Sequence, residues 1–206
     1  MNKPFRLLAL TAAVLTAFSF TLARAAVEIG QPAPAFTLTD LDGQAHSLAD
    51  FKGKIVVLEW HNPDCPFVKK HYEKSGHLPK LQKAATADDV IWLLINSGAP
   101  GKQGADYSAS EVKAYLNKNH STATAYLTDK DGNVGHLYGA KTTPHLFVIN
   151  DSGLLVYNGA IDSIRSADSA DIAKATDYVT AALTAVKAGK PVEKSATEPY
   201  GCSVKY

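Results

Sequence analysis

A cysteine at the junction of a strand-like and a helix-like segment is the residue best placed for chemistry in this sequence. Cys65 follows the strand-like segment 55–60 and precedes Pro66, whose fixed φ and missing N–H suit the first turn of a helix. Unpaired backbone N–H groups at a helix start favour negative charge, so a thiol there loses its proton more readily. Because the thiolate is the nucleophile, the pattern indicates redox or nucleophilic sulfur chemistry. The alternative is an inert buried thiol.

The only other cysteine, Cys202, lies near the end of the chain. If Cys65 became a sulfenic acid or a mixed disulfide, Cys202 could resolve that product through a flexible tail. A permanent structural bridge is a second possibility, because closing so long a loop stabilises a fold by about 4–5 kcal/mol. A bridge between two chains is the third, since spacing does not decide connectivity.

Three charged residues near Cys65 bear on its ionisation. Lys69 lies one helical turn further on and could stabilise a thiolate, unless it is simply solvated. Asp64 acts in the opposite sense, because a neighbouring negative charge favours the protonated thiol. Glu59 interrupts an otherwise apolar strand, and is either a proton acceptor near the sulfur or a strand-end residue that reaches water.

The first 25 residues have the pattern of a secretory signal peptide. Lys3 and Arg6 form a basic start, the stretch 7–22 is apolar and uncharged, and small residues precede Ala26. An uncleaved membrane anchor is the alternative, although a span needs about 20 apolar residues. We therefore expect a periplasmic or secreted protein, in a compartment where thiols can pair. Membrane contact is expected only through an uncleaved signal.

Residues 26–206 then form one domain over 26–190 and a polar tail over 191–206 that carries Cys202. Removing Lys3, Arg6 and Arg24 from the 21 basic residues leaves 18 against 20 acidic ones, a balance of −2. This near-neutral balance without a basic block excludes nucleic acid as the expected partner. Zinc-pair, haem-attachment and zinc-protease motifs are absent from the sequence, and no organic cofactor is expected.

Two continuous apolar runs, 55–58 and 90–95, are typical of strands buried on both faces of an α/β sheet. The sequence between them is helical and breaks at Ser75 and Gly76. Further expected elements are a turn-rich lead-in over 26–54, a helix opened by Ser108, a strand over 124–127, a hairpin over 146–157 and a last helix ending at Gly189. The loop 98–107 is either one wall of the site or an ordinary surface loop.

Together these motifs resemble the thioredoxin-like superfamily, specifically its peroxiredoxin-related redoxins of the alkyl hydroperoxide reductase/thiol-specific antioxidant (AhpC/TSA) type. The resemblance covers 27–206. The segments that carry it are 30–36, 51–54, 59–68, 138–145 and 201–206. The ending Gly-Cys-Ser-Val-Lys-Tyr looks like one exported bacterial branch of the group.

The resemblance implies an α/β thioredoxin-like fold, a single domain whose central mixed β-sheet is flanked by helices. It implies that Pro144 follows a cis peptide bond and faces the active cysteine. The Thr143 backbone would then face the sulfur and hydrogen-bond an extended thiol partner, with Asn62 as a further contact. Arg165 loosely matches arginines that orient peroxide in peroxiredoxins.

The chain also departs from its relatives. Thioredoxins carry two cysteines two residues apart, whereas Asn62 and Val68 stand at that spacing from Cys65, which excludes a local dithiol switch. Typical peroxiredoxins carry Pro-x-x-x-Thr-x-x-Cys, whereas Leu58 and Asn62 occupy the proline and threonine places.

The expected function is cysteine-dependent oxidoreduction: thiol–disulfide exchange, or hydroperoxide reduction as an antioxidant. The substrate would be a peroxide or a protein or small-molecule disulfide, and a thiol reductant would restore the cysteines. The alternative is a non-catalytic binding module or a copper carrier. In that case Cys65, His61 and His145 would supply a soft-metal site, whereas such histidines otherwise make ordinary polar contacts.

Overall fold

The computed structural model of the protein describes residues 27–206, so the signal peptide expected over 1–25 lies outside the described residues. The strands are β1 (Thr37–Asp40), β2 (Ala45–Ser47), β3 (Val56–Trp60), β4 (Ile91–Asn96), β5 (Ala125–Thr128), β6 (Thr142–Thr143), β7 (His145–Ile149), β8 (Leu155–Gly159) and β9 (Cys202–Ser203). The α-helices are α1 (Pro66–His71), α2 (His77–Ala87), α3 (Ala109–Lys118), α4 (Asn133–Tyr138) and α5 (Tyr178–Lys187). Within 27–206, the helices are too short or too polar to cross a membrane.

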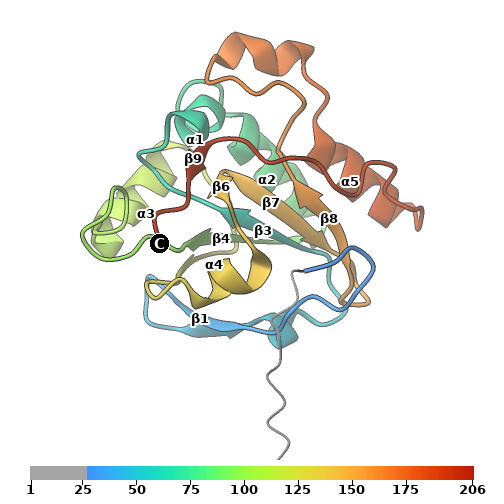
Figure 1. Cartoon of the computed structure of the whole chain (residues 1–206), viewed down its shortest axis with the longest axis horizontal. Helices are drawn as coiled ribbons and strands as arrows, with labels where there is room; N and C mark the ends of the chain where they lie inside the picture. Colours follow the sequence, from blue (N-terminus) through green and yellow to red (C-terminus); the bar gives the residue numbers. More distant parts are fainter. Residues whose placement is uncertain (1–26) are drawn as a thin grey trace, which may run out of the picture.

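Seven strands form one mixed sheet in the order β2-β1-β5-β4-β3-β7-β8 (Figure 1). The central strands β3, β4 and β5 run parallel, and β7 pairs antiparallel with β3. β6 and β9 form a separate two-stranded sheet. This arrangement confirms the expected α/β fold with a mixed sheet in a single domain.

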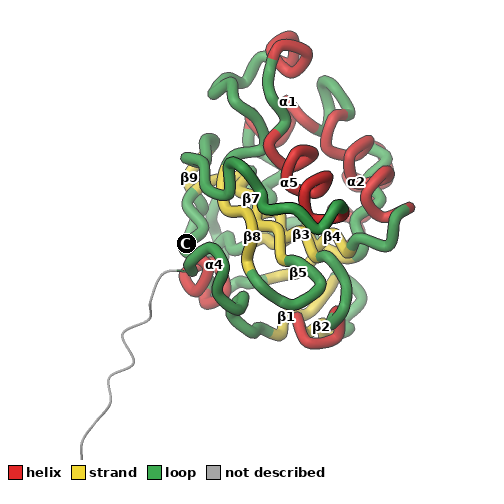
Figure 2. Tube along the Cα trace, turned by 90° about the vertical axis from the view of Figure 1, so that its right-hand side faces the viewer, coloured by secondary structure: helices red, strands yellow, loops and turns green. Residues whose placement is uncertain are grey.

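Every residue of β3 is buried, because both faces of the sheet are covered. Successive side chains of a strand point to opposite faces. Val57 accordingly belongs to the core cluster that includes residues of α1, α2, α3 and α5, whereas Trp60 belongs to the cluster that includes residues of α4. In Figure 2, α1, α2 and α5 lie together on one side of the sheet and α4 lies on the other.

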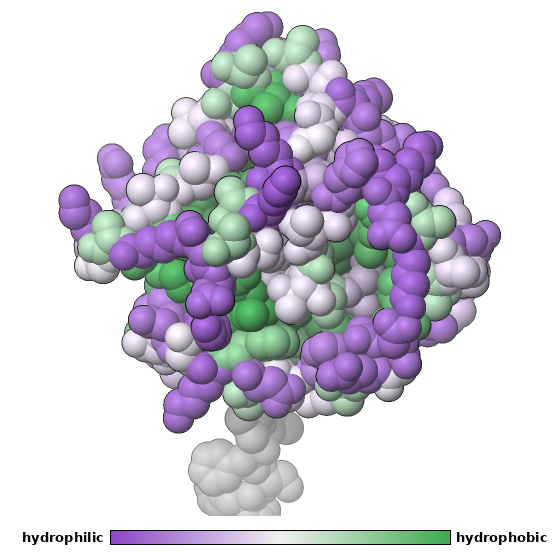
Figure 3. Space-filling view, turned by 180° about the vertical axis from the view of Figure 1, so that it is seen from behind, coloured by the Kyte–Doolittle hydropathy of each residue, from purple (hydrophilic) through white to green (hydrophobic). Residues whose placement is uncertain are grey.

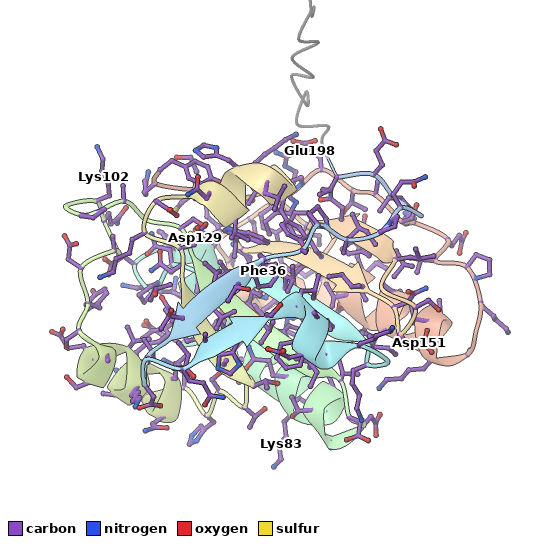
Figure 4. All side chains as sticks on the ribbon, turned by 90° about the horizontal axis from the view of Figure 1, so that it is seen from below. Phe36, Lys83, Lys102, Asp129, Asp151 and Glu198 are labelled. Atoms are coloured by element: carbon purple, nitrogen blue, oxygen red, sulfur yellow. The ribbon has the colours of Figure 1, made fainter. Side chains whose placement is uncertain are left out.

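The lead-in 26–54, expected to be turn-rich, also contains a hairpin. β1 pairs with β2 across a turn at Gly43, and β1 pairs antiparallel with β5. These strands were missed because they are short, polar and half-exposed. Phe36, just before β1, turns inward to the core and packs edge-on against Tyr138 (Figure 4).

Local signals elsewhere place the elements where the sequence predicts them. Gly76 adopts a positive φ between α1 and α2, where the helical break is expected. Ser108 and Glu111 form a capping box at the start of α3. The face seen in Figure 3 carries hydrophilic side chains between small hydrophobic patches, in keeping with the near-balanced charge.

The tail lies along the domain rather than apart from it. The backbone of Asn158 bonds to Ser195 and Thr197, and the Thr197 hydroxyl contacts that of Tyr157 at 2.7 Å. The chain then passes β6, where it forms β9, and ends near α4 (Figure 1). The tail therefore reaches the site as an ordered strand.

A buried ion pair joins α1 to the segment that follows β8. Lys70 Nζ lies 3.3 Å from Asp162 Oδ2, and both side chains are almost completely buried. Tyr200 from the tail donates to Asp162 Oδ1 at 2.5 Å and accepts from Lys70 at 3.3 Å. A buried charge is tolerated only when it is paired, so these residues depend on one another.

We therefore expect Lys70→Ala to lower the free energy of unfolding by about 3–5 kcal/mol, because it leaves the Asp162 carboxylate buried without its cation. Urea unfolding followed by circular dichroism measures the loss. Lys74→Ala, which changes an exposed lysine just after the same helix, is the control and should be nearly neutral. Equal losses in the two variants would contradict the expectation.

Candidate active site around Cys65

Cys65 is the N-cap residue of α1, with Pro66 in the first turn, as the sequence predicts. Its side chain is completely buried. The Cys65 Sγ donates a hydrogen bond to the Thr143 carbonyl oxygen at 2.9 Å. The Cys65 thiol therefore has no exposed surface, and its hydrogen-bond partner is a backbone oxygen that lies 78 residues away in sequence.

The peptide bond between Thr143 and Pro144 is cis, as the resemblance implies. Thr143 ends β6 and is itself buried. Its neighbour in the antiparallel register is Cys202 of β9. The expected contact residue Thr143 therefore contacts Cys65 and pairs with Cys202, and Pro144 follows it directly in the chain.

Cys202 is half-buried, and both cysteines are free thiols. Burial, followed by a hydrogen bond to the Cys65 sulfur and the charge of Cys65, raises the pKa of the Cys202 thiol to about 12. The Cys65 side chain therefore lies close enough to influence the ionisation of Cys202. Sequence spacing left their proximity open, and the tertiary structure brings them together.

Asn62 fixes the turn before Cys65. Its Oδ1 accepts from the Asp64 N–H at 2.9 Å, and its backbone carbonyl accepts from the Cys65 N–H at 3.1 Å. Its Nδ2 donates to the Gln103 carbonyl at 3.0 Å. At Gly104, a side chain would collide with the Asn62 amide, since a Cβ would lie only 2.0 Å from its oxygen.

The loop 98–107 is bonded to the turn that precedes Cys65 and to the C-terminal tail. Besides the Asn62 contact, Tyr107 donates to Asp64 Oδ1 at 2.8 Å. On the other side of the loop, the Ala99 N–H donates to the Lys205 carbonyl of the tail at 2.7 Å. Its outer part is exposed, as Lys102 at the molecular edge shows (Figure 4).

Glu59 does not reach water; that interpretation is wrong, because the side chain is completely buried in the middle of the sheet. Its carboxylate accepts from Tyr72 Oη and from Trp92 Nε1, both at 2.8 Å, and from Gln82 Nε2 at 3.4 Å. Burial raises the pKa of Glu59 to about 7, against the lowering effect of these three hydrogen bonds. A carboxyl group with such a pKa can exchange protons near neutral pH.

His61 is buried, and neither ring nitrogen has a hydrogen-bond partner among residues 27–206. Three tyrosine rings, those of Tyr72, Tyr115 and Tyr126, pack edge-on around it. Burial lowers the pKa of His61 to about 3, so the imidazole stays neutral.

His145 is engaged on both ring nitrogens. Nε2 lies 2.8 Å from the Asn158 amide oxygen, and Nδ1 accepts from the Lys141 N–H at 3.2 Å. Burial lowers its pKa to about 4. Within the described part of the chain, the structure holds no group of three or more His, Cys, Asp or Glu residues suited to a metal. The copper set of Cys65, His61 and His145 is therefore not assembled.

Lys69 and Arg165 are the two remaining candidate residues. Lys69 lines a small surface pocket with Asp64 and Glu73, and the structure gives it no hydrogen bond to Cys65. Arg165 is exposed and, within residues 27–206, forms no ion pair or hydrogen bond. The lysine of α1 that is buried is Lys70, which sequence reasoning missed because adjacent lysines give no sign of which one faces inward.

Comparison with known proteins agrees with this geometry. The Redoxin family matches residues 28–176, so the chain belongs to that family. The thiol-disulfide oxidoreductase ResA of Bacillus thuringiensis is 30% identical over 131 residues, covering 63% of this chain and 68% of ResA. A putative peroxiredoxin, bcp, of Coxiella burnetii is 26% identical over 121 residues, covering 59% of this chain and 72% of its own.

Among solved structures, a hypothetical protein of Sinorhizobium meliloti superposes with a TM-score of 0.72 and 26% identity, covering 88% of this chain and 96% of its own. The putative thiol:disulfide interchange protein DsbE of Chlorobium tepidum, at 20% identity and a TM-score of 0.51, covers 65% of this chain and 85% of its own and shares the fold. The thioredoxin-like redoxin assignment is confirmed, and the protein is a thiol-based oxidoreductase.

The raised pKa of Glu59 predicts a pH dependence of stability. The unfolded chain ionises Glu59 from about pH 4.5, whereas the folded state keeps it protonated to about pH 7. The contribution of Glu59 to the free energy of unfolding is therefore fully present below pH 4.5, and it is lost as the pH rises to about 7. Relative to Glu59→Gln, the wild-type free energy of unfolding should fall by about 3 kcal/mol over that range.

Urea unfolding at closely spaced pH values measures this difference. Glu73→Gln, at an exposed position of the same charge type, is the control and should follow the wild type throughout. A constant difference between wild type and Glu59→Gln from pH 4.5 to 8 would sink the expectation.

Proposed function

We propose that Cys65 and Cys202 form a dithiol–disulfide couple within one chain. The observation that carries this proposal is their shared partner. Thr143 accepts the Cys65 hydrogen bond and is also the register neighbour of Cys202. Cys65 is also one of the groups that raise the pKa of Cys202, and this supports the same pairing.

Cys65 acts as the nucleophile and Cys202 as the resolving thiol. With a disulfide substrate, the Cys65 thiolate attacks one sulfur, the substrate S–S bond breaks, and the leaving thiolate takes up a proton. Cys202, once deprotonated, then attacks the Cys65 sulfur and expels the second substrate thiol. Two protein thiols thereby become one disulfide, and an external thiol reductant reverses the change.

Glu59 is proposed as the proton store for this cycle. It is bonded to Tyr72, which belongs to the same core cluster as Cys65, so both groups lie on one face of the sheet. Its pKa of about 7 lets it gain or lose a proton at working pH.

Hydroperoxide reduction is the second branch of the same chemistry. There Cys65 attacks the peroxide oxygen, the O–O bond breaks to release an alcohol or water, and the sulfenic acid condenses with Cys202 to a disulfide and water. The resemblance to a putative peroxiredoxin supports it. The apolar Leu58 and the buried Asn62 in place of the peroxidase proline and threonine favour exchange.

We further propose that the protein works in an exported compartment, periplasmic or extracellular. The support is the basic and apolar pattern of residues 1–25, together with a cysteine pair suited to an oxidising environment. Its partners are then disulfide or peroxide substrates and a thiol reductant of that compartment.

Non-reducing peptide mapping tests the couple directly. Adding a small disulfide or peroxide should produce a dominant peptide that links Cys65 to Cys202, and a dithiol should remove it. Cys65→Ser should abolish oxidation of the pair, whereas Cys202→Ser should leave Cys65 to accumulate as a mixed disulfide or sulfenic acid. Two thiols that stay free after oxidant would sink the proposal.

Measuring disulfide reduction and peroxide consumption side by side distinguishes thiol–disulfide exchange from hydroperoxide reduction. If exchange dominates, the wild type should reduce insulin disulfides with a dithiol present, and Cys65→Ser should lower that rate by at least about a hundredfold, as expected for loss of a nucleophile. Peroxide consumption, supplied with the same dithiol, should be slow. Rapid peroxide consumption lost in Cys65→Ser would instead select the peroxidase branch.

A further inference from the structure

The C-terminal tail runs along β6, the strand whose Thr143 carbonyl accepts the hydrogen bond of Cys65. β9 pairs antiparallel with β6, placing Cys202 opposite Thr143 and Ser203 opposite Thr142. The Val204 N–H donates to the Lys141 carbonyl at 3.0 Å and so extends the contact past the strand. A chain segment therefore already occupies the backbone groups that an outside polypeptide strand would use.

We infer that residues 199–206 act as a built-in substrate strand, which holds Cys202 on Cys65 and closes this edge to other polypeptides until it is released. The role of Cys202 in the inference rests on the proposed dithiol function, whereas the closure of the edge does not.

Gly201 allows the tail to lie close to the Thr143 carbonyl oxygen. Its φ is +146°, and a Cβ there would lie 2.2 Å from the Thr143 carbonyl oxygen. That oxygen is the acceptor of the Cys65 thiol. Any side chain at position 201 must push the tail away from the atom that positions the sulfur, so Gly201 is a positioning residue for the reaction.

Two tyrosines anchor the strand on either side of Cys202. Before it, Tyr200 is buried, donates to Asp162 and packs edge-on against Phe67 of α1. After it, the Tyr206 hydroxyl donates to the Ala140 carbonyl at 2.8 Å, and its ring stacks on His136 at 3.9 Å. Gly135 leaves room for that ring, since a Cβ there would lie 2.6 Å from it.

The anchors explain why the active thiol is sealed. Cys65 has no exposed surface although it stands at a helix start beside loops. The tail pairs with Thr143, the partner of Cys65, and the loop 98–107 is joined to the tail by the hydrogen bond from the Ala99 N–H to the Lys205 carbonyl. The loop itself is held by the Asn62 side chain, so the tail is the part whose release opens the edge.

The test uses the full chain with Cys202→Ser, so that Cys65 is the only thiol. The probe is a synthetic peptide of residues 198–206 whose cysteine is activated as a 2-thiopyridyl disulfide. Cys65 attacks the peptide sulfur, the bond to the pyridyl sulfur breaks, and the released thiopyridone is followed by absorbance. Adding Gly201→Val or Tyr206→Ala should raise the rate by about tenfold or more, because a sealed group reacts in proportion to its open population.

Ser203→Val is the matched control, since Ser203 lies on the same strand with an exposed side chain, and its rate should equal that of the parent. Circular dichroism and thermal unfolding identify any variant that does not fold, and Tyr206→Ala provides the test if Gly201→Val fails. Equal rates in the parent and in the folded tail variants would overturn the inference.

In chains that retain Cys202, Gly201→Val should slow closure of the Cys65–Cys202 disulfide while it speeds capture of the outside peptide. A residue that merely supported the fold would not move these two rates in opposite directions. Failure of the proposed function would appear separately, as a missing Cys65–Cys202 peptide in oxidised wild type, and would leave the peptide-capture rates of the Cys202→Ser proteins unchanged.

Discussion

The carbonyl oxygen of Thr143 is the atom on which the site is organised. It accepts the hydrogen bond of the Cys65 thiol, it belongs to the residue paired with Cys202, and it limits how closely Gly201 can approach. A backbone oxygen can serve all three purposes because the paired strand β6 fixes its position, whereas a side-chain oxygen could rotate. The chemistry of the two sulfurs therefore depends on where β6 lies.

Elsewhere in the core the protein buries polar groups, and hydrogen bonds or ion pairs offset the cost of that burial. Glu59 is surrounded by three donors, and the Lys70–Asp162 pair is closed by a tail tyrosine. Burial of the Glu59 carboxyl outweighs these hydrogen bonds and raises its pKa to about 7.

Sequence patterns predicted the central part of the fold well, because long apolar runs and capping residues are local signals. The strands β3 and β4, the capping box of α3 and the break at Gly76 follow this rule. Short elements were missed where the local signal is weak. The hairpin of β1 and β2 is polar and half-exposed, and β6 and β9 exist only because two distant segments pair.

For the site, the residues around Cys65 determined that a thiol stands at a helix start, and family resemblance added the cis bond before Pro144. The sequence could not determine which sulfur, carbonyl or loop the thiol would meet, since those contacts join segments far apart in the chain. Only the tertiary structure decided that Cys202 reaches Cys65 on an ordered strand, that Glu59 is sealed from water and that Lys70 is the buried lysine. Burial and pairing depend on what the rest of the chain places opposite each residue, and single-sequence patterns do not contain that information.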